Sequence, residues 1–70
     1  MKIVAIGSVR ECSNGRVSRT TIVGDEAVRE YADTEDELPA RTVGAEVSVV
    51  WRRYLKDDGT QGGSREIVEL

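Results

Sequence analysis

The sequence predicts an α+β domain: a small four-stranded antiparallel sheet, in the order β-β-α-β-β, with one short helix packed on one face. Three observations lead to this prediction. Asn14-Gly15 and Asp58-Gly59 are turn sequences, and each lies between two segments rich in β-formers. Between these two pairs of segments, residues 25–32 place apolar side chains at helical spacing. Because the chain has 70 residues, we expect a single compact domain over residues 1–70.

The first predicted hairpin turns at Asn14-Gly15, between residues 1–11 and 16–23. The segment 3–6 is apolar on both faces, whereas a half-buried strand alternates. A two-residue loop suits the turn chemistry, but a three-residue loop gives the better charge pairing across the strands. We therefore predict the hairpin and leave its register open.

Residues 25–32 form the predicted helix. Its apolar face carries Ala27, Val28, Tyr31 and Ala32. Asp25 and Glu26 in the first turn suit the helix dipole. Pro39 limits any helix that begins near Thr34 to about one turn, because the residue before a proline leaves the helical region.

The second predicted hairpin pairs residues 45–56 with residues 64–70 across a glycine-rich loop at 57–63. Alternation places Trp51 on one face of the longer strand, and Arg52 and Tyr54 on the other.

The composition excludes several kinds of chemistry. The chain has no histidine and a single cysteine, so it lacks imidazole catalysis, a Cys-His pair and an intramolecular disulfide. A sheet of this size also rarely encloses a dry active site. We expect a protein that is not an enzyme, with no cofactor and no metal. No segment is apolar over a membrane's thickness, so we expect no membrane association and a cytoplasmic location.

Acidic residues concentrate in one stretch of the chain. Residues 25–37 carry seven acidic side chains and one arginine, against a net charge of −3 for the whole sequence. Such a surface can dock on a basic partner, including the groove of a nucleic-acid-binding protein, or simply keep a small protein in solution. We predict partner contacts from Glu26, Glu30, Asp33, Glu35, Asp36 and Glu37.

A second candidate surface lies in the strand at 45–56. Trp51, Arg52 and Tyr54 belong to the residue types enriched at protein interfaces. They also suit stacking on bases, with Lys56 nearby for phosphate. A third interpretation makes Trp51 the largest residue of the core. The net charge argues against a dedicated nucleic-acid binder.

We therefore predict a small non-enzymatic interaction module, an inhibitor or regulator that docks its acidic surface on a basic protein partner, as phage-encoded inhibitors do. The alternative is a nucleic-acid-binding domain that uses the basic, aromatic strand. A single helix covers only one face of the doubly apolar segment 3–6, so the other face should meet a partner or a second copy. A homodimer is favoured over a monomer.

Overall fold

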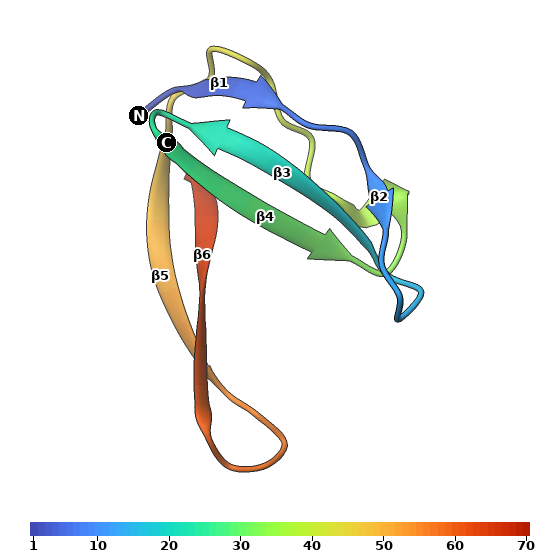
Figure 1. Ribbon diagram of the computed structural model, residues 1–70. Helices are drawn as coiled ribbons and strands as arrows, with labels where there is room; N and C mark the ends of the chain where they lie inside the picture. Colours follow the sequence, from blue (N-terminus) through green and yellow to red (C-terminus); the bar gives the residue numbers. More distant parts are fainter.

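The structure, a computed structural model, describes residues 1–70 and consists almost entirely of strands (Figure 1). The elements in chain order are β1 (Ile3–Ile6), β2 (Arg10–Glu11), β3 (Val17–Val23), β4 (Glu26–Ala32), the 3-10 turn η1 (Glu35–Glu37), β5 (Val47–Leu55) and β6 (Gln61–Glu69). The predicted α+β class is therefore wrong, because no helix packs on a sheet. No helix in the chain combines the length and apolarity needed to cross a bilayer.

The predicted helix at residues 25–32 is the strand β4. Val23 pairs with Glu26, so Gly24 and Asp25 form a two-residue hairpin loop. Gly24 has a φ of +60° and Asp25 does not have positive φ, which is the pattern of a type II′ turn. Along β4, Val28 and Ala32 are buried while Ala27, Arg29 and Tyr31 are exposed. The inward-facing position between Val28 and Ala32 is Glu30. Because this residue is polar, the alternation of apolar and polar residues that is typical of a strand could not be recognised in the sequence.

The first sheet has β3 at its centre. β4 pairs along one edge of β3, and β1 and β2 pair one after the other along its second edge. The register between β1 and β3 shifts between Ile3 and Ala5. The hairpin predicted at Asn14-Gly15 is present, but with Glu11 opposite Val17, so neither of the two registers considered is the one observed.

The second sheet is the hairpin β5–β6 alone, paired from Val47–Glu69 to Leu55–Gln61. Strands were correctly predicted in these segments, but they do not join β1–β4 in one four-stranded sheet. Figure 1 shows the hairpin running away from the first sheet. We call its distal part, residues 50–66, the arm.

The core lies where the two sheets meet. Five buried side chains form it, one from each of five strands: Ile3, Val23, Val28, Val47 and Ile67. A bridge between Lys2 and Glu46 and a hydrogen bond from the Ile3 N–H to the Ala45 carbonyl (3.1 Å) link β1 to the start of β5. The core therefore anchors only the base of the hairpin, and the arm lies beyond it.

Candidate functional site

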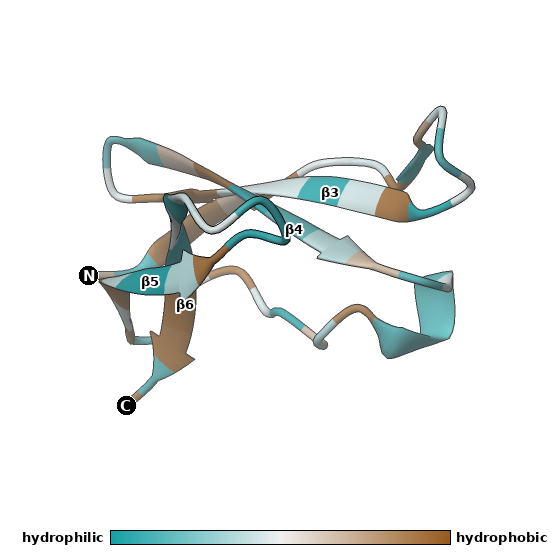
Figure 2. Cartoon of the chain, turned by 90° about the horizontal axis from the view of Figure 1, so that it is seen from below, coloured by the Kyte–Doolittle hydropathy of each residue, from teal (hydrophilic) through white to brown (hydrophobic).

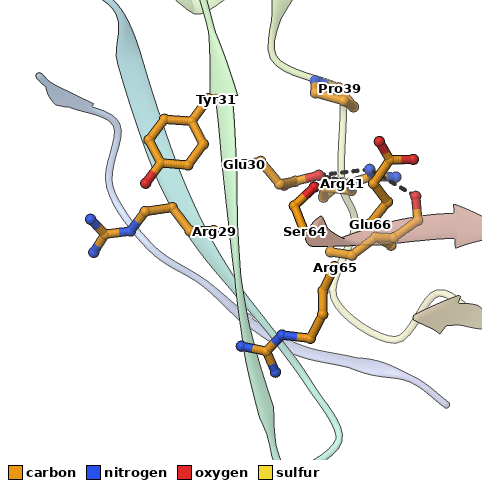
Figure 3. A pocket seen from close by; sticks show the side chains of 9 residues that line it. Arg29, Glu30, Tyr31, Pro39, Arg41, Ser64, Arg65 and Glu66 are labelled. Atoms are coloured by element: carbon orange, nitrogen blue, oxygen red, sulfur yellow. Dashed lines mark hydrogen bonds and ion pairs between the residues drawn. The ribbon is translucent and has the colours of Figure 1, made fainter. Parts of the chain in front are cut away.

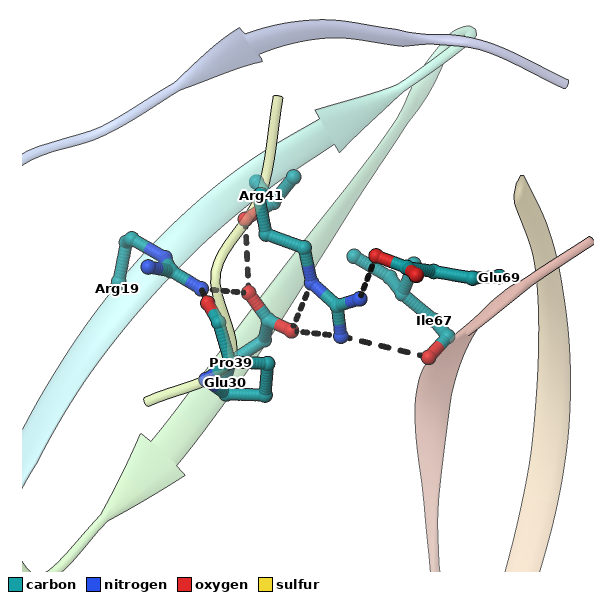
Figure 4. A network of polar contacts seen from close by, with 7 residues as sticks. Arg19, Glu30, Pro39, Arg41, Ile67 and Glu69 are labelled. Atoms are coloured by element: carbon teal, nitrogen blue, oxygen red, sulfur yellow. Dashed lines mark hydrogen bonds and ion pairs between the residues drawn. The ribbon is translucent and has the colours of Figure 1, made fainter. Parts of the chain in front are cut away.

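Glu30, predicted to contact a partner, lies inside the molecule. It points from β4 toward the space between the sheets, where its side chain is only 9% exposed. One carboxylate oxygen accepts hydrogen bonds from Arg19 Nη2 (2.7 Å) and Thr21 Oγ1 (2.9 Å). The other accepts from Arg41 Nε (2.9 Å) and Nη2 (2.7 Å), as Figure 4 shows. Glu30 is thus unavailable to a partner.

This network connects distant parts of the chain. Arg41 also donates to the Ile67 carbonyl of β6 (3.4 Å), and Arg19 donates to the Pro39 carbonyl (2.7 Å). Burial by itself raises the pKa of Glu30, but hydrogen bonds from Arg41, Arg19 and Thr21 outweigh it, so the pKa lies below its ordinary value. The network is a structural link between β3, β4 and β6.

The other predicted acidic residues do not form one surface. Glu26 begins β4, whereas Asp33 follows its end and pairs with Arg16 (3.1 Å). Glu35, Asp36 and Glu37 are exposed in η1, and no basic side chain lies within ion-pair distance of them. In Figure 2 the turn that follows β4 is coloured as hydrophilic. Only η1 therefore remains a compact acidic patch.

The predicted residues Trp51, Arg52 and Tyr54 are brought together on the arm. Trp51 is 62% exposed, so the interpretation of Trp51 as a core residue is wrong. Leu55, on the same face as Trp51, is 74% exposed. Tyr54 is exposed on the opposite face, where Arg52 Nε pairs with Glu66 (2.8 Å). Both faces of the arm therefore present large apolar side chains to solvent.

The aromatic rings of the arm rest on the glycines of β6. A Cβ added at Gly62 would lie 2.7 Å from the Tyr54 ring, and one added at Gly63 would overlap the Trp51 indole. Glycine at these positions lets each ring approach the backbone of the partner strand, as when an aromatic side chain covers a strand glycine. The two rings are therefore exposed to solvent on one side and held against the backbone of β6 on the other.

A cleft of about 420 Å³ lies between β4 and β6, the unpaired edges of the two sheets (Figure 3). At one end, Arg65 Nη2 of β6 donates to the Ala27 carbonyl of β4 (2.8 Å). Figure 3 shows Arg29 and Tyr31 on the other side of β4 from Glu30. The lining has few apolar side chains, so the cleft lacks the apolar walls of a small-molecule site.

Sequence reasoning missed both the burial of Glu30 and the cleft, because each depends on how the two sheets meet. Comparison with protein-family models, with curated proteins and with solved structures gives no match for this chain.

Proposed function

We propose that the protein is a non-enzymatic protein-binding module, an inhibitor or regulator in the cytoplasm, and that the arm is its contact element. The observation that carries this proposal is the exposure of Trp51, Tyr54 and Leu55 on a hairpin whose buried apolar packing is confined to its base. Tryptophan, tyrosine and arginine dominate the binding energy of protein interfaces. Positioned rings also lose less conformational entropy on binding.

The chemistry of the arm describes the partner surface that suits it. Trp51 and Leu55 share a face with Arg53, which has no carboxylate within ion-pair distance. A complementary surface offers an apolar pocket with a carboxylate beside it. The acidic turn η1 lies elsewhere on the molecule and can add contacts only with a partner that reaches beyond the arm.

Nucleic-acid binding by the arm is the weaker alternative. Arg52 is neutralised by Glu66 (2.8 Å), and the tip carries two further carboxylates, Asp57 and Asp58. These negative charges oppose the approach of phosphates. The exposed apolar area favours a protein partner instead.

A capture experiment tests the proposal. The protein is immobilised and exposed to a lysate of the cells it comes from, next to Trp51→Ser and Leu55→Ser variants. Tyr31→Ser is the matched control, because Tyr31 is a similarly exposed aromatic residue on β4, outside the arm. We expect one protein to be captured by the wild type and by the control, and each arm variant to bind it about 30-fold more weakly, as at an interface hot spot.

Trp51, the one tryptophan of the chain, reports the contact directly. Adding the captured and purified protein should shift the emission of Trp51 to shorter wavelength, because an exposed indole enters an apolar pocket.

Equal capture by the wild type, both arm variants and the control would overturn the proposal. Capture of nucleic acid alone, lost steeply with added salt, would replace it with the alternative. If the Trp51 emission of the isolated protein shifted to shorter wavelength as its own concentration rose, the partner would be a second copy of the chain.

A further inference from the structure

The outer face of the first sheet contains a hollow without any acidic side chain. Its volume is about 160 Å³, and it is lined by Gly7, Ser8, Arg10, Ser18, Arg19, Thr20 and Arg29. No lining residue is hydrophobic. In a chain whose net charge is −3, such a concentration of arginines and hydroxyls needs an explanation.

The strand register shows how the two exposed arginines come to flank this hollow. Arg10 of β2 lies opposite Ser18, and Arg29 of β4 lies opposite Thr20. Ser18 and Thr20 belong to the central strand β3, and alternation places their side chains on one face. The two guanidinium groups therefore extend from both flanking strands beside the same pair of hydroxyls.

Neither Arg10 nor Arg29 has a carboxylate within ion-pair distance. Arg19, the third arginine of the lining, is different, because its guanidinium pairs with Glu30 on the inner face. Two cations without carboxylate partners on the same sheet face make a positive potential that attracts an anion.

The interruption between β1 and β2, residues 7–9, leaves room for a further hydrogen-bond donor from β3. The Thr20 carbonyl accepts a hydrogen bond from the Gly7 N–H (2.8 Å), so the Thr20 backbone faces this break. No backbone hydrogen bond returns from the Thr20 N–H to Gly7 or Ser8. In a regular antiparallel pair both bonds form. The Thr20 N–H therefore points toward the residues between β1 and β2 without a bond to Gly7 or Ser8.

We propose that Arg10 and Arg29, on the two strands that flank β3, bind a small oxyanion of the phosphate class beside the hydroxyls of Ser18 and Thr20. Guanidinium forks match the geometry of phosphate oxygens, and the hydroxyls and the Thr20 N–H add neutral donors. A volume of 160 Å³ corresponds to about five water molecules, which suits a compact anion and not a drug-sized ligand.

Inorganic phosphate is the first probe, added to the ¹⁵N-labelled protein at low ionic strength, with sodium chloride of equal ionic strength as the reference. We expect saturable shifts at the amides of Ser8, Ser18 and Thr20. Phosphoserine is the second probe. Tighter binding of phosphoserine would identify the anion as a phosphoryl group on a larger molecule, and equal binding would identify the free ion.

Arg10→Gln and Arg29→Gln are the test variants, and Arg53→Gln, on the arm, is the matched control. All three side chains are exposed and without an ion-pair partner, so the fold should persist, as the dispersion of the amide spectrum will show. Each test variant should bind phosphate at least about tenfold more weakly, and the control should bind like the wild type. Equal effects of phosphate and chloride, or equal affinity in all variants, would overturn the proposal.

Discussion

The indole of Trp51 occupies the space beside Gly63 that any larger residue would fill with its own side chain. The two residues are not directly opposite, because Trp51 pairs with Arg65 and Gly63 lies two residues earlier on β6. The contact is therefore a diagonal one across the hairpin, within reach of a large ring. It holds the indole against the backbone of β6, in a part of the hairpin that lies beyond the core.

Gly63→Ala should displace the indole without unfolding the domain. The added methyl would overlap the ring, but Trp51 is exposed and can rotate away. We expect the near-UV circular dichroism of Trp51 to fall, and the free energy of unfolding to change by less than about 1 kcal/mol. Ser64→Ala is the control, and it should leave the spectrum unchanged. An intact Trp51 signal in Gly63→Ala would contradict the observed packing.

Glu30→Gln should destabilise the protein strongly. The substitution leaves Arg19 and Arg41 with side chains only 11% and 7% exposed and no buried carboxylate between them. Removing one partner of a buried ion pair costs about 3–5 kcal/mol. Glu69→Gln, which removes the exposed carboxylate 3.7 Å from Arg41, should cost less than about 1 kcal/mol. Urea unfolding of both variants measures the difference, and similar losses would contradict the central role of Glu30.

The same carboxylate should make stability depend on pH. Because the pKa of Glu30 is lower in the folded protein than its ordinary value of 4.5, the folded state favours the ionised form. Its contribution is complete above pH 4.5 and is lost as the pH falls through the lowered folded value. Urea midpoints measured from pH 7 downward should drop in this window, and Glu30→Gln should drop less. Parallel curves would contradict this assignment.

Gly24→Ser distinguishes the observed strand from the helix that the sequence suggested. At the first position of a type II′ turn, with φ of +60°, serine is strained and should cost about 1–2 kcal/mol. Before a helix, the same serine would act as an N-cap and be stabilising or neutral. Asp25→Ala is the control, with a change below about 0.5 kcal/mol. Increased stability of Gly24→Ser would contradict the hairpin.

The sequence allowed strands to be predicted where local signals were unambiguous. The alternation in residues 45–56 led to the correct placement of Trp51 and Tyr54 on opposite faces of β5. The same reasoning failed at β4, because Ala27, Val28, Tyr31 and Ala32 happen to fit a helical face. Gly24-Asp25 was the available signal, since glycine followed by another residue is typical of a type II′ turn.

The binding surfaces were harder to predict than the strands. A run of carboxylates in the sequence indicates local charge, but not the direction in which each side chain points. In β4 the pleat turns Glu30 inward, while Arg29 and Tyr31 face outward. The buried arginine partners come from β3 and from the segment before β5, which no local pattern connects. The exposure of Trp51 depends on where the core ends along the hairpin, and that is a tertiary property.

The regular pairing of β5 with β6 makes the reach of the arm an adjustable quantity. From Val47 to Leu55 the two strands pair without a bulge, a span of about 27 Å at the usual rise per residue. Removing two residues from each strand of the arm would shorten it by about 7 Å and keep every remaining side chain on its own face. Removing one residue from each would exchange the two faces and carry Tyr54 to the side that Trp51 now occupies. The length of the arm and the face on which each side chain lies can thus be changed separately, while the core at the base of the hairpin stays the same.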